Sequence, residues 1–401
     1  MSEERKKFTL GSLLPWHNDH EGVIWVVLIL MTIGMLNIFS STFIKAENDF
    51  GNPYYYLTRH GISLVLSLIV MFISSRTNYH RWRHWIVPVG VAVLLSVLAA
   101  SVAGPEINGA RRWLVLGPLS VQPSEFAKLI TVIISAYYLS YQLDKNKPIV
   151  LVSRLIFIII AFAVAVETGP DLGTAAVVFG VPIIMMLLAG MSYKLIAILT
   201  PILLAGGYYL CTLQDYRMAR MNAFLNPWSD PQGFGFQTVR SLTAIGSGGF
   251  SGMGLGHGLS KYDYLPEAHT DFAFAVFSQE NGFICVCGVL LLYGMLMLFS
   301  TRIANNAPDT FGQLLATGIM VLIVGQATVN MMMVSGFFPV VGVPLPFISY
   351  AGSALLMSSF AVGLLYNIGK SGYEKQLQEQ EQEPPPVRRI SKPKSSLKLV
   401  K

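Results

Sequence analysis

Long apolar runs recur along the whole 401-residue chain and constrain its fold more than any other feature. A backbone in lipid can satisfy its hydrogen bonds only within helices or closed barrels, and a helix needs about 20 apolar residues to cross. The candidate runs are 23–44, 57–75, 85–103, 121–141, 150–166, 172–190, 191–212, 271–301, 313–335 and 347–369. We therefore predict an all-α membrane protein with about ten transmembrane helices.

Composition supports this fold class and excludes several others. Hydrophobic residues make up 53% of the chain and charged residues 12%, about half the ~25% that is usual in soluble domains. These values exclude a soluble globular enzyme, a disordered protein and a disulfide scaffold. The net charge of +6 does not indicate nucleic acid, because much of the basic excess lies in a proline-containing C-terminal segment. That segment suits anionic membrane lipids or fixes topology.

The distribution of Lys and Arg predicts the orientation of the chain. Basic residues concentrate in the segments that share a side with the N-terminus, and such segments are cytoplasmic. An even number of spans then places both termini in the cytoplasm. We expect a cytoplasmic segment at 1–22, a membrane domain at 23–369 and a disordered basic tail at 370–401. Residues 213–270 form a large extracytoplasmic loop between the seventh and eighth predicted helices.

Asp271 is the first candidate for chemistry. It lies where the large loop re-enters the membrane, directly after Thr270. Two interpretations are open. The two residues could cap the helix that begins there, because such residues favour helix N-termini. Alternatively, a carboxylate at the water–lipid boundary could act as a general base on a hydroxyl group.

Other polar residues gather on the predicted outer side. Arg111 and Arg112 are adjacent and suit a diphosphate, which guanidinium groups bind through paired hydrogen bonds. The alternative is a solvated turn that Trp113 anchors at the interface. Glu125 and Lys128 lie three apart on one helical face, so they either join helices as a pair or contact substrate.

Three further segments carry weaker signals. Asp171 opens the sixth predicted helix and either caps it or lines the same outer cavity. The glycine-rich stretch 246–258 could cradle phosphate through backbone N–H groups, although tight packing of a loop explains it more simply. The prolines of 342–350 interrupt a helix at membrane depth, which is tolerated where the backbone is buried in protein or lines a cavity.

In combination, eight motifs resemble the SEDS family (shape, elongation, division and sporulation), whose members include FtsW, RodA and SpoVE. They are ARRWL, QPSEFAKL, PDLGTA, NPWSDPQGFGFQ, AIGSGG, LPEAHTDF, GQATVN and PLPFISYAGS, in family order over about residues 20–370. LPEAHTDF favours an FtsW-like member, whereas the run at 339–344 is more similar to RodA. The resemblance implies a peptidoglycan glycosyltransferase that polymerises lipid II and releases undecaprenyl diphosphate. This takes place at the outer face of the bacterial cytoplasmic membrane, during cell division or elongation.

The resemblance also implies partners and residue roles. The partners are a class B penicillin-binding protein transpeptidase and other divisome or elongasome proteins. Asp271 matches the essential acid of the family, which activates the acceptor sugar's 4-hydroxyl or helps to hold a divalent cation, Mg²⁺ or Mn²⁺. The other implied cavity residues are Arg111, Glu125, Lys128, Asp171, Lys261, Glu267 and His269. Their Arg and Lys side chains would bind the diphosphate, which leaves as an anion.

Two competing functions are a lipid II flippase and a non-catalytic scaffold for the transpeptidase. A flippase needs polar groups facing both sides of the membrane and a path between them. The notable polar residues of this chain gather on the outer side, whereas the inner loops are short and mainly basic. This asymmetry favours chemistry at the outer face.

Overall fold

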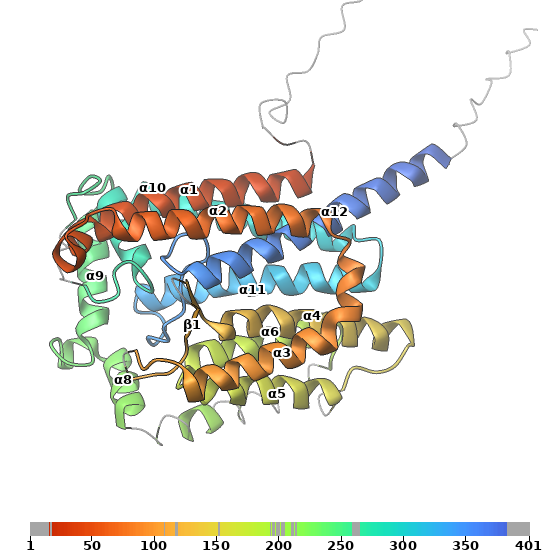
Figure 1. Cartoon of the computed structure of the whole chain (residues 1–401), viewed down its shortest axis with the longest axis horizontal. Helices are drawn as coiled ribbons and strands as arrows, with labels where there is room; N and C mark the ends of the chain where they lie inside the picture. The colour runs from red at the N-terminus through yellow and green to blue at the C-terminus, as the bar shows by residue number, and fades with distance from the viewer. Residues whose placement is uncertain are drawn as a thin grey trace, which may run out of the picture.

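A computed structural model of the chain describes residues 16, 18–107, 109–116, 119–150, 153–192, 194, 197, 201, 205–209, 212, 215–258 and 265–382. These residues form a bundle of long helices, with α8 (Asp215–Leu225) and α9 (Phe236–Gly248) at one end (Figure 1). The first described helix begins, and the last one ends, at the opposite end of the bundle.

Helices dominate the described residues. The bundle contains α1 (Asp19–Phe50), α2 (Tyr55–Arg76), α3 (Trp82–Ala103), α4 (Pro123–Asp144), α5 (Arg154–Glu167), α6 (Leu172–Leu188), α10 (Ala273–Asn305), α11 (Thr310–Val334) and α12 (Gly352–Gln382). The smaller elements are η2 (Tyr79–Arg81), η3 (Pro227–Ser229), α8 (Asp215–Leu225), α9 (Phe236–Gly248) and an antiparallel hairpin of β1 (Leu114–Leu116) and β2 (Leu119–Val121). The all-α class is confirmed.

Within the described part of the chain, seven helices are long and apolar enough to cross a bilayer: α1, α2, α3, α4, α10, α11 and α12. Helix α6 is a shorter apolar helix, and α5, expected at 150–166, has 14 residues. These helices confirm a multi-pass membrane protein. The span expected at 191–212 lies largely outside the described residues, so the count of ten stays a prediction.

The prediction of a disordered tail that begins at residue 370 was wrong for residues 370–382. Helix α12 continues to Gln382, so residues 370–382 are helical rather than part of a disordered tail. Hydropathy marks the end of the apolar run, but a helix can continue on polar side chains that pair one turn apart. Lys370 and Glu374 approach to 3.6 Å, and Lys375 and Glu379 to 3.9 Å.

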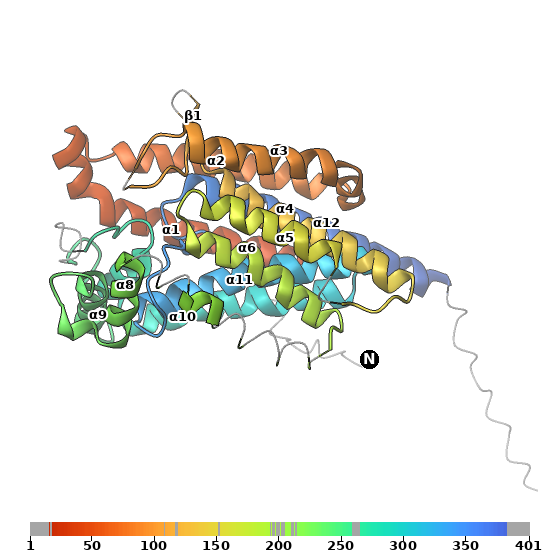
Figure 2. The ribbon, with the colours of Figure 1, turned by 90° about the horizontal axis from the view of Figure 1, so that it is seen from below.

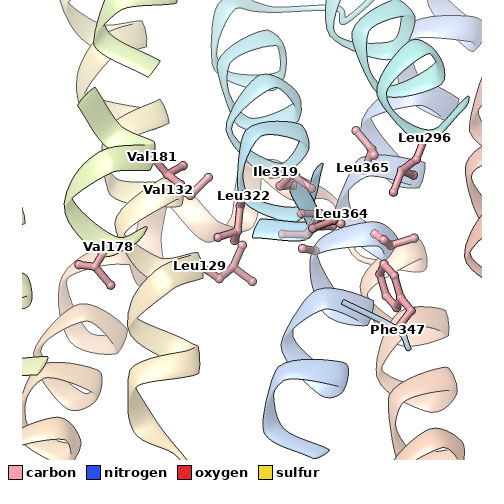
Figure 3. Close-up of a cluster of buried hydrophobic side chains, with 14 of the residues drawn as sticks. Leu129, Val132, Val178, Val181, Leu296, Ile319, Leu322, Phe347, Leu364 and Leu365 are labelled. Carbon is pink, nitrogen blue, oxygen red and sulfur yellow. The ribbon is translucent and has the colours of Figure 1, made fainter. Parts of the chain in front are cut away.

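Helices α4 and α11 form the centre of the bundle. Helix α4 packs against α3, α6 and α11, and α11 also contacts α10 and α12. Most of the apolar stretch of α4 and α11 is buried, whereas most of α2, α3 and α10 faces outward, as expected of helices in contact with lipid. Figure 2 shows α4, α6 and α11 running together along the bundle. Figure 3 shows their side chains in the core, with Leu129, Val178 and Leu322 among them.

Helix α10 is interrupted at Gly282, whose φ of 73° and ψ of −178° are not helical. Residues 249–256, called the glycine strap below, pack against this break. Gly254 N donates to the free carbonyl of Glu280 at 3.0 Å. A Cβ built at Gly252 would lie 2.2 Å from the same oxygen, so only glycine allows this approach. The contacts support packing as the reason for the glycine-rich stretch.

Candidate active site

Asp271 lies in the turn that leads into α10, two residues before Ala273. Its backbone oxygen accepts a hydrogen bond from Asn330 Nδ2 at 2.8 Å. Its carboxylate is half-buried and adjoins Gly342, because a Cβ built at Gly342 would lie 3.3 Å from Asp271 Oδ2. Among the described residues, no hydrogen bond joins this carboxylate to the first turn of α10. The helix-capping interpretation of Asp271 was therefore wrong.

Charged side chains from four separate elements surround the Asp271 carboxylate. Burial, and next the carboxylates of Glu267 and Asp171, raise the pKa of Asp271 to about 7 from its usual 3.8. The guanidinium groups of Arg112 and Arg220 act in the opposite direction. The structure thus gathers three acids and two arginines at one end of the bundle. A carboxylate with a pKa near the working pH is suited to general base catalysis.

Asp171 caps α6, as one of its two predicted interpretations expected, and its place in an outer cavity stays a prediction. Its Oδ1 accepts a hydrogen bond from Thr174 N at 3.1 Å and so caps α6. The same oxygen lies 3.8 Å from Arg112 Nη1. Arg112 is fixed further by Gly169, whose carbonyl accepts from Nε at 2.9 Å, and by the carbonyl of Pro170. The cap therefore also holds a guanidinium group beside the site.

Arg111 takes a different direction from Arg112. Its side chain is exposed, and Nη2 lies 3.6 Å from Glu106 Oε2. Its Nη1 donates to the carbonyl of Val102, near the end of α3, at 3.3 Å. Of the two adjacent arginines, the structure brings Arg112 to Asp271 and turns Arg111 toward α3. A role for Arg111 in binding stays a prediction.

Glu125 and Lys128 form a buried ion pair with 2.7 Å between Oε2 and Nζ. Lys128 also donates to Gln326 Oε1 at 2.9 Å, and Gln326 Nε2 donates to the carbonyl of Pro344 at 2.9 Å. A small cavity borders the pair. Among the described residues, these contacts link the pair to the backbone at Pro344, and no hydrogen bond or ion pair joins it directly to Asp271. The geometry therefore favours the structural interpretation over direct contact with substrate.

Glu267 shapes the turn that presents Asp271. Its φ is 53°, in the left-handed region, which few non-glycine residues adopt. Its backbone oxygen accepts from Thr270 N and from Phe272 N, both at 3.1 Å. Thr270 Oγ1 donates to Glu267 Oε2 at 2.7 Å. These bonds hold the Glu267 carboxylate close enough to act on Asp271.

His269 is buried between aromatic rings rather than open to a cavity. Its ring centroid lies 5.2 Å from that of Tyr56 and 5.7 Å from that of Tyr350. Burial, and next the ammonium group of Lys45, lower the pKa of His269 to about 4, while Glu267 raises it. The imidazole is therefore neutral near pH 7 and cannot serve as a cation for a diphosphate. Its contacts indicate a structural role.

The sequence did not identify every residue of the site. Lys261, one of the predicted residues, lies outside the described residues. Arg220 of α8 was missed, although it acts on Asp271 and donates to Val340 O at 3.4 Å. Asn330 and Gln326 were also missed, because the motif that contains them was recognised without a role for either residue. The signal that could have found them is the GQATVN motif, which places two amides four residues apart on one face of a membrane helix.

Comparison with known proteins agrees with this architecture. The model of the FtsW/RodA/SpoVE family, described as cell cycle protein, matches residues 21–374. Stage V sporulation protein E of Bacillus subtilis is 37% identical over 355 residues, covering 87% of this chain and 96% of that protein. A probable peptidoglycan glycosyltransferase FtsW of Trichlorobacter lovleyi is 38% identical over 356 residues, covering 86% and 92%.

Solved structures show the same fold. A chain from a peptidoglycan synthase complex superposes with a TM-score of 0.74 at 28% identity, covering 88% of this chain and 98% of the other. The rod shape determining protein RodA of Thermus thermophilus gives a TM-score of 0.64 at 26% identity, covering 90% and 99%. The resemblance found in the sequence is confirmed, and the chain belongs to the FtsW/RodA/SpoVE family of cell cycle proteins.

Proposed function

We propose that this chain, a membrane-embedded peptidoglycan glycosyltransferase, polymerises lipid II with Asp271 as its general base. The observation that carries the proposal is the setting of the Asp271 carboxylate. It is half-buried and flanked by two acids and two arginines, with its pKa near 7. Such a carboxylate is deprotonated in part of the population at neutral pH and still basic enough to accept a proton.

The reaction can be written from these residues. The acceptor sugar's 4-hydroxyl oxygen forms a bond to the anomeric carbon of the lipid-linked donor, and its proton passes to Asp271. The bond between that carbon and the donor diphosphate breaks, and the diphosphate leaves with the electron pair. Arg112 and Arg220 carry the positive charge that stabilises this leaving anion. Base and cations lie on the same end of the bundle, as the reaction requires.

A divalent cation fits this site if its ligands come partly from the protein and partly from the phosphates of the substrate. In the part of the chain that the structure describes, no three His, Cys, Asp or Glu side chains gather into a metal site. Mg²⁺ is often held by one or two carboxylates together with substrate phosphates. We propose that Asp171, beside Asp271, supplies such a carboxylate to an Mg²⁺ or Mn²⁺ ion bound with the diphosphate, while Asp271 acts as the base. No step above depends on that ion.

We further propose the setting in which the enzyme works. The positive-inside distribution supports cytoplasmic termini and an Asp271 end at the outer face of the bacterial cytoplasmic membrane. The solved relative from a peptidoglycan synthase complex is described as coordinating polymerization and crosslinking. This description supports a class B penicillin-binding protein transpeptidase as partner, within a divisome or elongasome assembly.

The proposal is tested by polymerisation of lipid II with the full chain and its co-expressed transpeptidase. Asp271→Asn retains the shape of the side chain but cannot act as a base. Asp144→Asn, at an exposed position at the end of α4, is the matched control. We expect glycan strands from the wild type and the control, and none from Asp271→Asn.

Each other outcome has a defined meaning. Equal strands from all three proteins would remove Asp271 from the chemistry. If an intact complex supplied with Mg²⁺ or Mn²⁺ makes no strands in any form, the polymerase assignment fails. Transport of lipid II across vesicles would then be measured, because transport supports the flippase and its absence supports the scaffold.

A further inference from the structure

Asn330 links the Asp271 turn to the segment that covers it. It lies on α11 and is fully buried. Its Nδ2 donates to the backbone oxygen of Asp271 at 2.8 Å and to that of Val343 at 2.7 Å. We propose that Asn330 is a positioning residue, which holds the Asp271 carboxylate at the geometry that transfer requires. This inference rests on the proposed role of Asp271 as the base.

The orientation of the Asn330 amide follows from its neighbours. Both groups at hydrogen-bond distance are carbonyl oxygens, so the NH₂ group must face them. Asn330 Oδ1 is buried and has no hydrogen-bond partner among the described residues. The side chain is therefore used as a double donor alone. Its two N–H groups join two backbone segments that are distant in sequence.

The covering segment, residues 339–346, is fixed at several points. Gln326, one turn before Asn330 on α11, donates to Pro344 O at 2.9 Å. Arg220 of α8 donates to Val340 O at 3.4 Å. On the α6 side, a Cβ built at Gly173 would lie 2.0 Å from Val341 O, so the segment packs closely on the start of α6. Asn330 is the contact that joins this fixed segment to Asp271.

The 339–346 segment in turn borders the reacting group. Gly342 has a φ of 69°, and its position adjoins Asp271 Oδ2. If the Asn330 bonds are lost, the turn and the segment can separate, and water gains access to the carboxylate. A misplacement of about 1 Å at a catalytic group can cost on the order of 10²-fold in rate. Greater access to water also lowers the pKa of a carboxyl group whose pKa burial has raised.

The test compares Asn330→Leu with the wild type in the complex with the transpeptidase. Leu has a similar size and no donor. We expect kcat for lipid II polymerisation to fall about 10²-fold with KM changed less than about threefold, and the acid limb of the kcat–pH profile to move below the wild-type limb. Thr328→Val is the control, because Thr328 is exposed and, among the described residues, its side chain bonds only to Val324 O of its own helix.

Two further variants keep the inference open to contradiction. Asn330→Gln keeps both donors but moves them by one methylene, so it should show a smaller fall in kcat and a smaller movement of the acid limb. It replaces Asn330→Leu if that protein does not fold. Gly342→Ala leaves Asn330 intact and presses on Asp271 Oδ2, and it should reproduce the fall in kcat.

The positioning role is overturned if Asn330 variants that assemble normally keep full kcat. It is also overturned if they lose activity with an unchanged pH profile, which indicates a structural role only. Activity of Asp271→Asn is a separate outcome, because it would defeat the proposed base itself. Loss of activity in Asp271→Asn with normal Asn330 variants leaves the base in place and removes only the positioning role.

Discussion

Lys128 Nζ lies 2.7 Å from Glu125 Oε2 in the centre of the bundle, and both side chains are almost wholly buried. Burying a charged side chain at membrane depth costs free energy, so such side chains occur there mainly as ion pairs. The pair also reaches the 339–346 segment through Gln326, whose Oε1 accepts from Lys128. It therefore connects α4, α11 and the segment that covers Asp271.

Removing one member of this pair should destabilise the protein more than removing both. Lys128→Met leaves a buried carboxylate without its partner and should lower the free energy of unfolding by about 3–5 kcal/mol. The double variant Glu125→Leu with Lys128→Met should recover most of this loss. Unfolding in detergent measures both values, with the exposed Lys145→Met as control. A double variant no more stable than Lys128→Met contradicts the pair as the source of the effect.

The rate of polymerisation should depend on pH through Asp271. The pKa of this group is raised to about 7, and only its deprotonated form can accept a proton. Activity should therefore be low in acid and rise as the pH passes through about 7. In Glu267→Gln one of the two neighbouring acids that raise the pKa becomes neutral, so the limb should move to lower pH.

The measurement is kcat against pH for the wild type, Glu267→Gln and Asp144→Asn. Asp144 is exposed at the other end of α4, and its variant should follow the wild-type curve. A limb that keeps its position in Glu267→Gln would show that Asp271 does not control the profile.

The two adjacent arginines should differ in function. Arg112 acts on Asp271 and lies 3.8 Å from Asp171 Oδ1, whereas Arg111 is exposed beside Glu106. Arg112→Ala should lower kcat/KM for lipid II by at least about 10²-fold, the scale of losing one anion-stabilising donor. Arg111→Ala should change it less than about threefold.

Arg112→Lys separates charge from geometry in this comparison. It keeps the cation but loses the planar fork that bonds Gly169 O, so it should fall between wild type and Arg112→Ala. Polymerisation kinetics at several lipid II concentrations provide the values. A larger loss in Arg111→Ala than in Arg112→Ala would reverse the assignment.

The helices could be predicted from sequence because lipid requires continuous apolar runs, and seven of the predicted spans appear as long apolar helices. The break in α10 could not be predicted in this way. Gly282 lies within an apolar run, and hydropathy does not register a change of φ. The break is stabilised by the glycine strap, which lies outside the apolar run in sequence and contacts it only in the folded protein.

The sequence predicted the acidic residues of the site better than its arginine and amide residues. Asp271, Asp171 and Glu267 were all expected near one cavity, and Glu267 and Asp171 both raise the pKa of Asp271. Adjacent side chains in an irregular loop have no fixed period, so spacing could not separate Arg112 from Arg111. Asn330 and Asp271 lie 59 positions apart in sequence. Their contact depends on how α11 packs beside the turn before α10, which the sequence pattern does not reveal.

The glycine strap should be needed for the stability of the break in α10. Phe283 N, which has no helical partner beyond the break, donates to Gly249 O at 2.9 Å. Gly252 has a φ of 80°, and a Cβ there would lie 2.2 Å from Glu280 O. Gly252→Ala should therefore lower the free energy of unfolding by about 2–4 kcal/mol, through backbone strain and the displaced carbonyl.

Gly246 offers the matched control for this change. It is exposed within α9, and a Cβ there would meet no atom within 4 Å. Gly246→Ala should stabilise the protein by about 0.5–1 kcal/mol, because alanine loses less backbone entropy in a helix. Thermal or denaturant unfolding of both variants in the same detergent gives the comparison. If Gly252→Ala is as stable as Gly246→Ala, the strap does not hold the break, and another contact must support the carbonyl of Glu280.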